Sequence, residues 1–407
     1  MSHIFDATKL NYPSGSIVNG MKYYTYYDVI TNYGGKIPLD CEYFHITNEQ
    51  MGNMIKQRSL AYPQKIEYPS NLKILTIEPK ILKSFNSKPI TISKLHDSIE
   101  VIYMRDCRIG KFENLPTNLK YLDVSANRIS KLPENPVNCL LYINISNNYL
   151  TELTDNYLPE TLEYLDFSCN SLRNIPAKFP DNITILRLAC VSSKSSVKNI
   201  EHNIKHLPNN LEKLDCHNSN IVSISHFPEK LKIIDISDNR KLYEIPQLPP
   251  NLIEFDAYNC KLSSFTGNIP DSVEKLEIGH NRFNSISNIP LSIKNFGISV
   301  NNITDLPDFP SNISQLVRIA IDSNPIKYIS PHNYNILKGH YSKVARRNYQ
   351  LNRLFLSDIK IHSTQFFNDY FGIDSDKDIY RNVEGSYDLD EEEFYRLIEY
   401  YDQFFGL

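Results

Sequence analysis

One spacing pattern recurs through most of this 407-residue chain and limits what it can fold into. Between Leu72 and Ile329 twelve segments place apolar residues at the same offsets, most of them 20 to 23 residues apart. The clearest segment runs from Leu119 to Pro133 as L-K-Y-L-D-V-S-A-N-R-I-S-K-L-P. A unit this short cannot bury its own apolar face, so neighbouring units must stack and share one elongated core. The first apolar position of the twelve segments is held by Leu72, Ile99, Leu119, Leu140, Leu162, Ile183, Leu211, Leu231, Leu252, Val273, Ile293 and Leu316.

The skeleton L-x-x-L-x-L-x-x-N-x-L-x-x-L-P is the signature of a leucine-rich repeat. The segment 121–125 is short and alternating, which predicts one strand of a parallel sheet in each unit. The asparagine that follows marks the turn out of the strand, where its amide can donate to and accept from backbone groups. We expect a structural ladder of Asn127, Asn148, Asn170, Asn239, Asn281, Asn301 and Asn324. Cys107 and Cys260 occupy the same position in two units. Because the repeat accepts cysteine there, we expect these two thiols to be structural rather than catalytic.

Prolines flank the part of each unit that returns to the next strand. They lie three residues before the first apolar position at Pro69, Pro116, Pro159, Pro180, Pro208, Pro228, Pro249, Pro270 and Pro290. Such short legs between prolines leave no room for an α-helix and favour an extended crossing. The predicted fold class is therefore an α/β repeat solenoid: a short-period horseshoe with a parallel sheet on its concave side, a mostly non-helical convex side and a helical C-terminal cap.

The units that end in Leu-Pro resemble the repeats of bacterial type III-secreted leucine-rich-repeat effectors. The segments Phe265-Thr-Gly-Asn-Ile-Pro270 and Phe283 to Gly297 also resemble FNIP repeats, known from social amoebae and giant amoebal viruses. Together with the excess of Asn, Ile, Lys and Tyr, these segments make the chain similar to the leucine-rich-repeat proteins of giant viruses. The resemblance covers about two thirds of the chain and implies a fold rather than an activity.

The two ends depart from the repeat and define three regions. Residues 1–65 are expected to form an N-terminal cap, residues 66–330 the repeat solenoid, and residues 331–407 a helical C-terminal cap. In the last region, apolar side chains from Phe394 to Phe405 recur at helical spacing. Packing against the last repeat and docking of another protein both fit that stripe. The Ser- and Lys-rich stretch 191–208 lengthens one period, either as a solvated loop or as a partner contact.

Charge, cysteine usage and hydropathy predict the compartment of the chain and limit the classes of partner. The net charge of −4 gives no signal for nucleic acid or an anionic membrane. The seven cysteines lack metal-ligand spacing, and the N-terminus lacks a basic-then-apolar leader. No apolar run reaches the roughly 18 residues of a spanning helix. We therefore expect an intracellular protein, in the host cytoplasm if it is viral, that is not secreted and has no transmembrane segment.

The motifs that would signal chemistry are incomplete in this chain. A cysteine-dependent ubiquitin ligase of the kind that follows the repeats of bacterial relatives needs a thiol beyond them, and Cys260 is the last cysteine. The segment that starts at Asp374 begins like a calcium loop, but Ile379 and Gly385 replace the required Gly and Glu. Cys41 and His45 lack an evident third orienting group. No metal site, cofactor, catalytic residue or small-molecule substrate is expected.

The residues between the two strand leucines are expected to face the concave side. This column contains the acids Asp123, Asp166, Asp215, Asp235, Asp256 and Glu277, and the column beside it contains Tyr121, Tyr142 and Tyr164. Stacked about 4.8 Å apart, they suit a protein partner that offers Lys, Arg and apolar side chains. Asp is also frequent at this position of such repeats whatever they bind, so both interpretations stay open.

The sequence favours a non-catalytic protein–protein interaction scaffold that acts through the concave face, with host proteins as candidate partners. The alternative is a substrate-recognition adaptor for the ubiquitin machinery of a host. Such an adaptor would need an F-box-like end domain, and residues 1–65 lack the leading Leu-Pro of that motif. An enzyme would need a polar cluster in the end regions. The partner's identity and the oligomeric state do not follow from the sequence.

Overall fold

The computed structural model describes residues 17–18, 20–25, 29, 36–46, 68–77, 89–93, 95–133, 137–153, 158–190, 200–311, 316–321, 323–326, 330, 332–333 and 336. The chain divides into two compact units, Met1–Leu252 and Ile253–Leu407. In both units the main-sheet elements are short strands, one per coil, and each pairs with the strand of the next coil.

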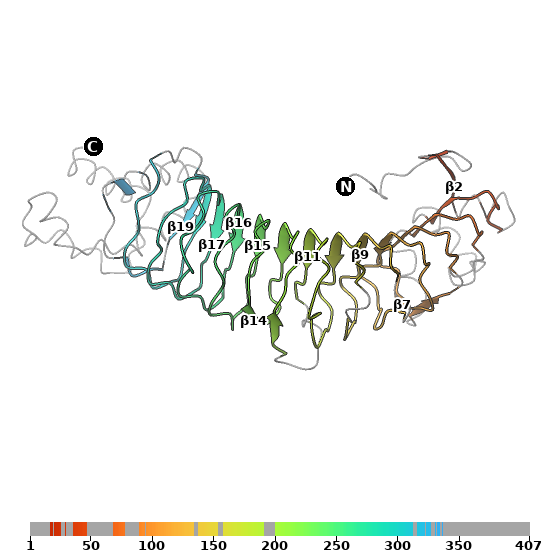
Figure 1. Ribbon diagram of the computed structural model, residues 1–407, viewed down its shortest axis with the longest axis horizontal. Helices are drawn as coiled ribbons and strands as arrows, with labels where there is room; N and C mark the ends of the chain where they lie inside the picture. Colours follow the sequence, from red (N-terminus) through yellow and green to blue (C-terminus); the bar gives the residue numbers. More distant parts are fainter. Residues whose placement is uncertain are drawn as a thin grey trace, which may run out of the picture. The chain divides into compact units, whose positions relative to one another are not determined.

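In the first unit the main sheet has the strand order β1-β2-β3-β4-β6-β8-β9-β10-β11-β13-β15. The pair β1–β2 is antiparallel, and the strands from β2 onward pair in parallel. Figure 1 shows the arrows of successive coils side by side. The strands are β1 Ile17–Val18, β2 Met21–Thr25, β3 Tyr43–Ile46, β4 Ile74–Ile77, β6 Val101–Met104, β8 Tyr121–Asp123, β9 Tyr142–Asn144, β10 Tyr164–Asp166, β11 Ile185–Arg187, β13 Lys213–Asp215 and β15 Ile233–Asp235.

The second unit repeats the arrangement with a sheet in the order β16-β17-β18-β19. Its pairs are parallel and in register, with Asp256 opposite Glu277 and Gly297 opposite Ala320. The strands are β16 Glu254–Asp256, β17 Lys275–Glu277, β18 Asn295–Gly297 and β19 Arg318–Ala320. The predicted parallel-sheet solenoid of stacked coils is confirmed in both units.

The core follows the apolar columns of the repeat. In the coil that begins at Leu119, the side chains of Leu119, Leu122, Val124 and Ile129 are at most 1% exposed. Where a proline lies three residues before the first apolar position, its carbonyl accepts a hydrogen bond: the Leu119 amide donates to the Pro116 carbonyl at 3.2 Å, closing a four-residue turn. In the coil of Ile99 the same turn forms with His96 in place of proline. The turn therefore belongs to the coil geometry, and proline stiffens it.

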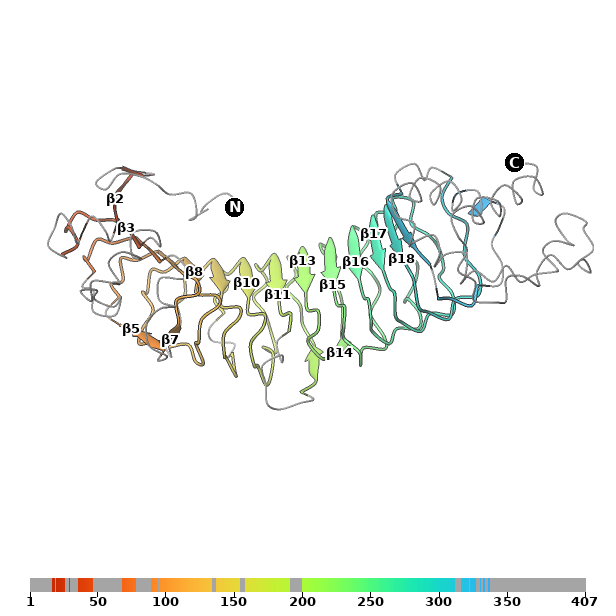
Figure 2. The same ribbon diagram turned by 180° about the vertical axis from the view of Figure 1, so that it is seen from behind.

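The return legs contain turns, bends and short strands wherever they are described. Two parallel strand pairs lie there, and Figure 2 places β14 on the opposite side of the coils from β13 and β15. The prediction of a mostly non-helical convex side is confirmed, but the sequence did not predict these strands. They are β5 Ile90–Ile92 with β7 Ile109–Phe112, and β12 His202–Ile204 with β14 Ile221–Ile224.

One column of the repeat, directly before the ladder asparagine, has left-handed backbone. Its φ angles lie between 49° and 57° in successive described coils, a region that asparagine tolerates better than most residues. Asn147, Asn218 and Asn259 occupy it, whereas Val300 brings a β-branched side chain to φ 56°. That conformation is costly for valine because Cβ crowds the following carbonyl.

Replacing Val300 by asparagine is expected to raise the unfolding free energy by about 1 kcal/mol. The side chain is 37% exposed, so little apolar burial is lost. Urea unfolding of the variant beside the parent measures the change, and Val317→Asn, at 68% exposure and without positive φ, is the control. Equal shifts for both variants would show that backbone strain is not the cause.

Part of the predicted N-terminal cap continues the sheet of the repeats. Strands β2 and β3 fall within residues 1–65, and both extend the parallel ladder of β4. The predicted C-terminal helices, including the stripe from Phe394 to Phe405, lie outside the described residues, as does the Ser-rich segment 192–196.

Candidate functional site

The ladder asparagines bind backbone groups of neighbouring coils. Asn148 is fully buried; its Nδ2 donates to the carbonyls of Val124 and Ile145, both at 3.0 Å, and its Oδ1 accepts from the Ile129 amide at 2.9 Å. One side chain thus joins its own turn to the preceding coil. The same pattern of bonds is found at Asn127, Asn170, Asn239, Asn281, Asn301 and Asn324.

Other residues substitute for asparagine in this column. The Cys107 thiol donates to the Arg105 carbonyl at 3.2 Å, and burial raises its pKa. Ser219, which sequence reasoning missed, donates to the Leu188 carbonyl at 2.7 Å. A deeply buried thiol whose pKa is raised is a poor nucleophile, so Cys107 fits a structural role. None of the seven cysteines, all of which lie among the described residues, forms a disulfide bond.

Cys41 and His45 make their hydrogen bonds to other residues. Burial, followed by the charge of Asp40, raises the pKa of the Cys41 thiol to about 12, and the thiol donates to the Tyr43 carbonyl at 3.5 Å. His45 is buried, with its Nδ1 2.5 Å from the Thr76 hydroxyl. The arrangement lacks the thiolate that nucleophilic catalysis requires.

The first and third residues of each three-residue strand point away from the core and form what we call the strand face. In the first unit, the register places Asp123, Asn144, Asp166, Arg187, Asp215 and Asp235 side by side on consecutive strands. In the second unit, the same column continues as Asp256, Glu277, Gly297 and Ala320. The structure therefore brings the predicted acids into two ordered rows, one per unit.

Each aspartate of the column caps its own strand end. Asp123 Oδ1 accepts from the Ser125 amide at 3.0 Å and from its hydroxyl at 2.7 Å, and Asp235 does the same with Ser237. Asn144 replaces the acid without loss of these bonds. The bonds explain why Asp suits this position of a repeat, and they occupy one carboxylate oxygen and leave the other for cross-coil contacts.

Basic side chains of nearby coils neutralise several of the acids. Lys275 Nζ lies 3.0 Å from Asp256 Oδ2, and an Arg187 guanidinium nitrogen lies 4.0 Å from Asp166 Oδ2. Glu277 reaches past one coil toward Arg318 at 3.6 Å, and its carboxylate fills the space where a Cβ on Gly297 would stand. The strand face is therefore less acidic than the sequence column suggests.

Burial separates some acids of the column from the others. Asp123 and Asp166 are each 6% exposed, and burial is the first cause that raises the pKa of both carboxyl groups. Burial also raises the pKa of Glu277. A carboxyl whose pKa is raised by folding binds its proton more tightly in the native state, so its ionisation opposes folding.

The unfolding free energy of the parent is expected to fall as pH rises, because the buried Asp123 carboxyl ionises. Asp123→Asn should remove this dependence on pH. In the parent, this contribution is fully present below the ordinary Asp pKa of 3.8 and declines as pH passes through the raised native value. The unfolding free energy of parent minus variant should therefore fall as pH rises above the ordinary Asp pKa. Any fixed cost of the new amide beside Asn144 is equal at every pH. Chemical unfolding of both proteins at a series of pH values measures this difference. A difference that is constant or rises with pH would contradict the claim that burial raises the pKa of Asp123.

The three predicted tyrosines form a continuous stack. The ring centroids of Tyr121 and Tyr142 are 4.1 Å apart, those of Tyr142 and Tyr164 are 4.2 Å apart, and the rings are parallel within 9°. Val101 and Ile185 hold the register positions at either end. Since the rings cover one another's faces, the stack offers edges and hydroxyl groups rather than open faces for a base or a cation.

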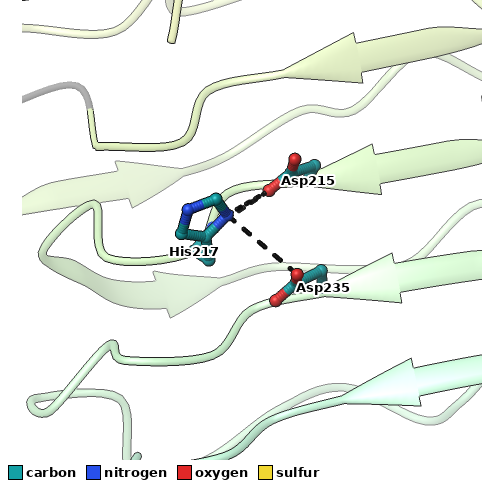
Figure 3. A group of neighbouring side chains, drawn as sticks. All are labelled: Asp215, His217 and Asp235. Carbon is teal, nitrogen blue, oxygen red and sulfur yellow. Dashed lines mark hydrogen bonds and ion pairs between the residues drawn. The ribbon is translucent and has the colours of Figure 1, made fainter. Parts of the chain in front are cut away.

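One cluster on the strand face brings together an imidazole and two carboxylates. His217 Nδ1 lies 2.7 Å from Asp215 Oδ1 and 4.0 Å from Asp235 Oδ2, and Figure 3 shows the ring beside both aspartates with its Nδ1 toward them. The side chains of Asp215, His217 and Asp235 are 20%, 39% and 36% exposed. Sequence reasoning included the two acids but missed His217, whose signal is a histidine in a column that elsewhere often holds serine.

Comparison with known proteins agrees with this geometry. The family model described as Leucine Rich Repeat matches residues 118–140. Podocan of Mus musculus is 26% identical over 251 residues, which cover 57% of this chain and 38% of podocan. Keratocan of Gallus gallus is 25% identical over 251 residues, which cover 56% of this chain and 69% of keratocan. The chain thus spans well under half the length of podocan. The resemblance to FNIP repeats of giant viruses stays a prediction.

Among solved structures, YopM from Yersinia enterocolitica is similar with a TM-score of 0.56 and 23% identity, covering 72% of this chain and 58% of YopM. At that identity the likeness shows the fold alone. No helix among the described residues is long and apolar enough to cross a membrane. The repeated columns and the stacked parallel coils are those of the leucine-rich-repeat fold, and residues 118–140 match the family model of that repeat.

Proposed function

We propose that this protein is a non-catalytic interaction scaffold that binds another protein through the strand face of its first unit. The observation that carries the proposal is the pair Asp215 and Asp235. These aspartates stand opposite each other on neighbouring strands and are part-exposed, and the imidazole of His217 lies within 4.0 Å of both. Stacked repeats present such side chains as one extended surface, which is how solenoids bind partners.

The chemistry of this surface selects a partner with Lys or Arg side chains. Two carboxylates on neighbouring strands attract a basic group more strongly than one, and rim charges of this kind chiefly speed association. Asp123 and Asp166 contribute less because they are buried. The edges and hydroxyls of the tyrosine stack, which begins at Tyr121, add contacts of mixed polarity.

The test is a comparison of captured proteins. Immobilised parent, the double variant Asp215→Asn with Asp235→Asn, and the control Asp123→Asn are exposed to the same cell lysate, and bound proteins are quantified by mass spectrometry. We expect proteins that the parent and Asp123→Asn retain and the double variant loses at least about tenfold, with the difference shrinking at high salt.

Equal capture by all three proteins would reject the strand face of the first unit as the binding surface. Ubiquitin-ligase subunits among proteins that the double variant retains would instead favour the alternative function, a substrate-recognition adaptor. Melting temperatures of the three proteins show whether the substitutions leave the fold intact, which is expected because Asn144 occupies the same column naturally.

A further inference from the structure

We propose that Asp215, His217 and Asp235 form a binding site for a divalent transition-metal ion such as Zn²⁺. One ligand atom from each residue, the Nδ1 of the imidazole and one oxygen of each carboxylate, can be chosen so that all three lie within 4.8 Å of one another. Imidazole and carboxylate are the nitrogen and oxygen donors that bind this class of ion. The sequence pattern alone predicted no metal site, because His217 lies outside the acidic column.

The distances between the donor atoms bracket those that an ion imposes. Bonds of about 2.0–2.2 Å to nitrogen and oxygen place two ligand atoms of one ion about 3.0–3.5 Å apart. In the structure, Nδ1 of His217 is 2.7 Å from Asp215 Oδ1 and 4.0 Å from Asp235 Oδ2. An ion between them therefore requires only side-chain rotations, with the strands β13 and β15 held in register by the sheet.

The fold by itself does not require a histidine at this position. In other coils a serine hydroxyl two residues after the capping residue donates to its Oδ1, as Ser125 does to Asp123 and Ser237 does to Asp235. His217 keeps that contact through Nδ1 and also comes within reach of the next coil's carboxylate. The imidazole thus adds a nitrogen donor where serine would satisfy the turn.

The donor set also selects the class of ion. Ca²⁺ takes six to eight oxygen ligands and Mg²⁺ favours oxygen in an octahedron, whereas one imidazole with two carboxylates suits Zn²⁺, Mn²⁺ or Co²⁺. Three protein ligands leave coordination positions open toward the strand face, as in metal sites that accept water or an external ligand. Arg187, the register neighbour of Asp215, lies within 4.0 Å of Asp166 instead.

Isothermal titration calorimetry of the chelator-treated full chain with ZnCl₂, and in parallel with MnCl₂, tests the site. We expect saturable binding of one ion per chain. His217→Ser and Asp235→Asn should each lower the association constant at least about tenfold, because each removes a ligand. Since serine fills this column elsewhere, His217→Ser should melt at the parent's temperature. The control replaces His206 and His226, two exposed histidines with ring centroids 6.5 Å apart, by glutamine and should bind like the parent.

Three results would each overturn the site. They are absence of saturable binding by the parent, parent-like affinity of His217→Ser, and loss of binding in the His206 and His226 control. The result is separable from the proposed function, since His217→Ser retains both carboxylates. A protein that captures its partner equally well with serine at position 217, and no longer binds Zn²⁺, supports both. Failure of metal binding with intact capture rejects the metal site alone.

Discussion

Replacing Asn148 by alanine is expected to lower the free energy of unfolding by about 1–3 kcal/mol. The side chain is fully buried, and its removal leaves the Ile129 amide without its Oδ1 acceptor at 2.9 Å. It also removes Nδ2 donors from the carbonyls of Val124 and Ile145. The carbonyls of Val124 and Ile145 each keep a bond from another ladder asparagine, Asn127 and Asn170. Alanine offers no acceptor to the Ile129 amide, and the neighbouring coils close the space to solvent, so this donor stays unsatisfied.

Asn138→Ala is the matched control for this measurement, because Asn138 is exposed and lies in the turn directly before the unit of Asn148, which begins at Leu140. Asn147, although exposed and adjacent, is unsuitable. Its φ is 55°, and alanine there would add a backbone cost of its own. Chemical unfolding of both variants gives the answer: equal losses for Asn148→Ala and Asn138→Ala would mean that the ladder does not hold the coils together.

Tyr142→Ala is expected to cost about 2–4 kcal/mol, comparable to the loss of a ladder asparagine. Tyr142 is the middle ring of the stack and loses two parallel contacts, to Tyr121 at 4.1 Å and to Tyr164 at 4.2 Å. Removing it opens a gap between three consecutive coils that small shifts cannot close, because the strand register fixes their spacing.

Tyr142→Phe separates stacking from the hydroxyl group. It keeps both ring contacts and should cost less than about 1 kcal/mol. Thermal melting of the two variants beside the parent makes the comparison, and a phenylalanine variant as unstable as the alanine variant would place the stabilisation in the hydroxyl. For binding experiments the phenylalanine variant is the suitable probe, since the alanine variant changes stability as well as surface.

The candidate site shows where a column of the repeat is sufficient to predict a surface and where it is not. The period of the repeat by itself aligns Asp215 with Asp235, because parallel coils of nearly equal length stack equivalent positions. The same alignment makes Asp123 equivalent to them. Its neighbours bury it to 6% exposure, so the chemistry of the two positions differs although their place in the repeat is the same.

Contacts across coils lie beyond the sequence pattern for a related reason. Glu277 passes over Gly297 to approach Arg318 because glycine leaves room for its carboxylate. His217 is outside the predicted column, yet its Nδ1 lies within 4.0 Å of two of the column's acids. Each contact depends on the rotamer and length of side chains that belong to different coils, which periodicity does not encode.

The sequence by itself determined the parallel solenoid, its apolar core and the absence of room for helices on its convex side. These features repeat every 20 to 23 residues in most units, and a short unit can bury its apolar positions only against the next. The tertiary structure alone decided which acids are buried, which are paired and which meet an imidazole. Those outcomes depend on distances of a few ångströms between side chains of separate coils, and burial and charge both vary steeply over that range.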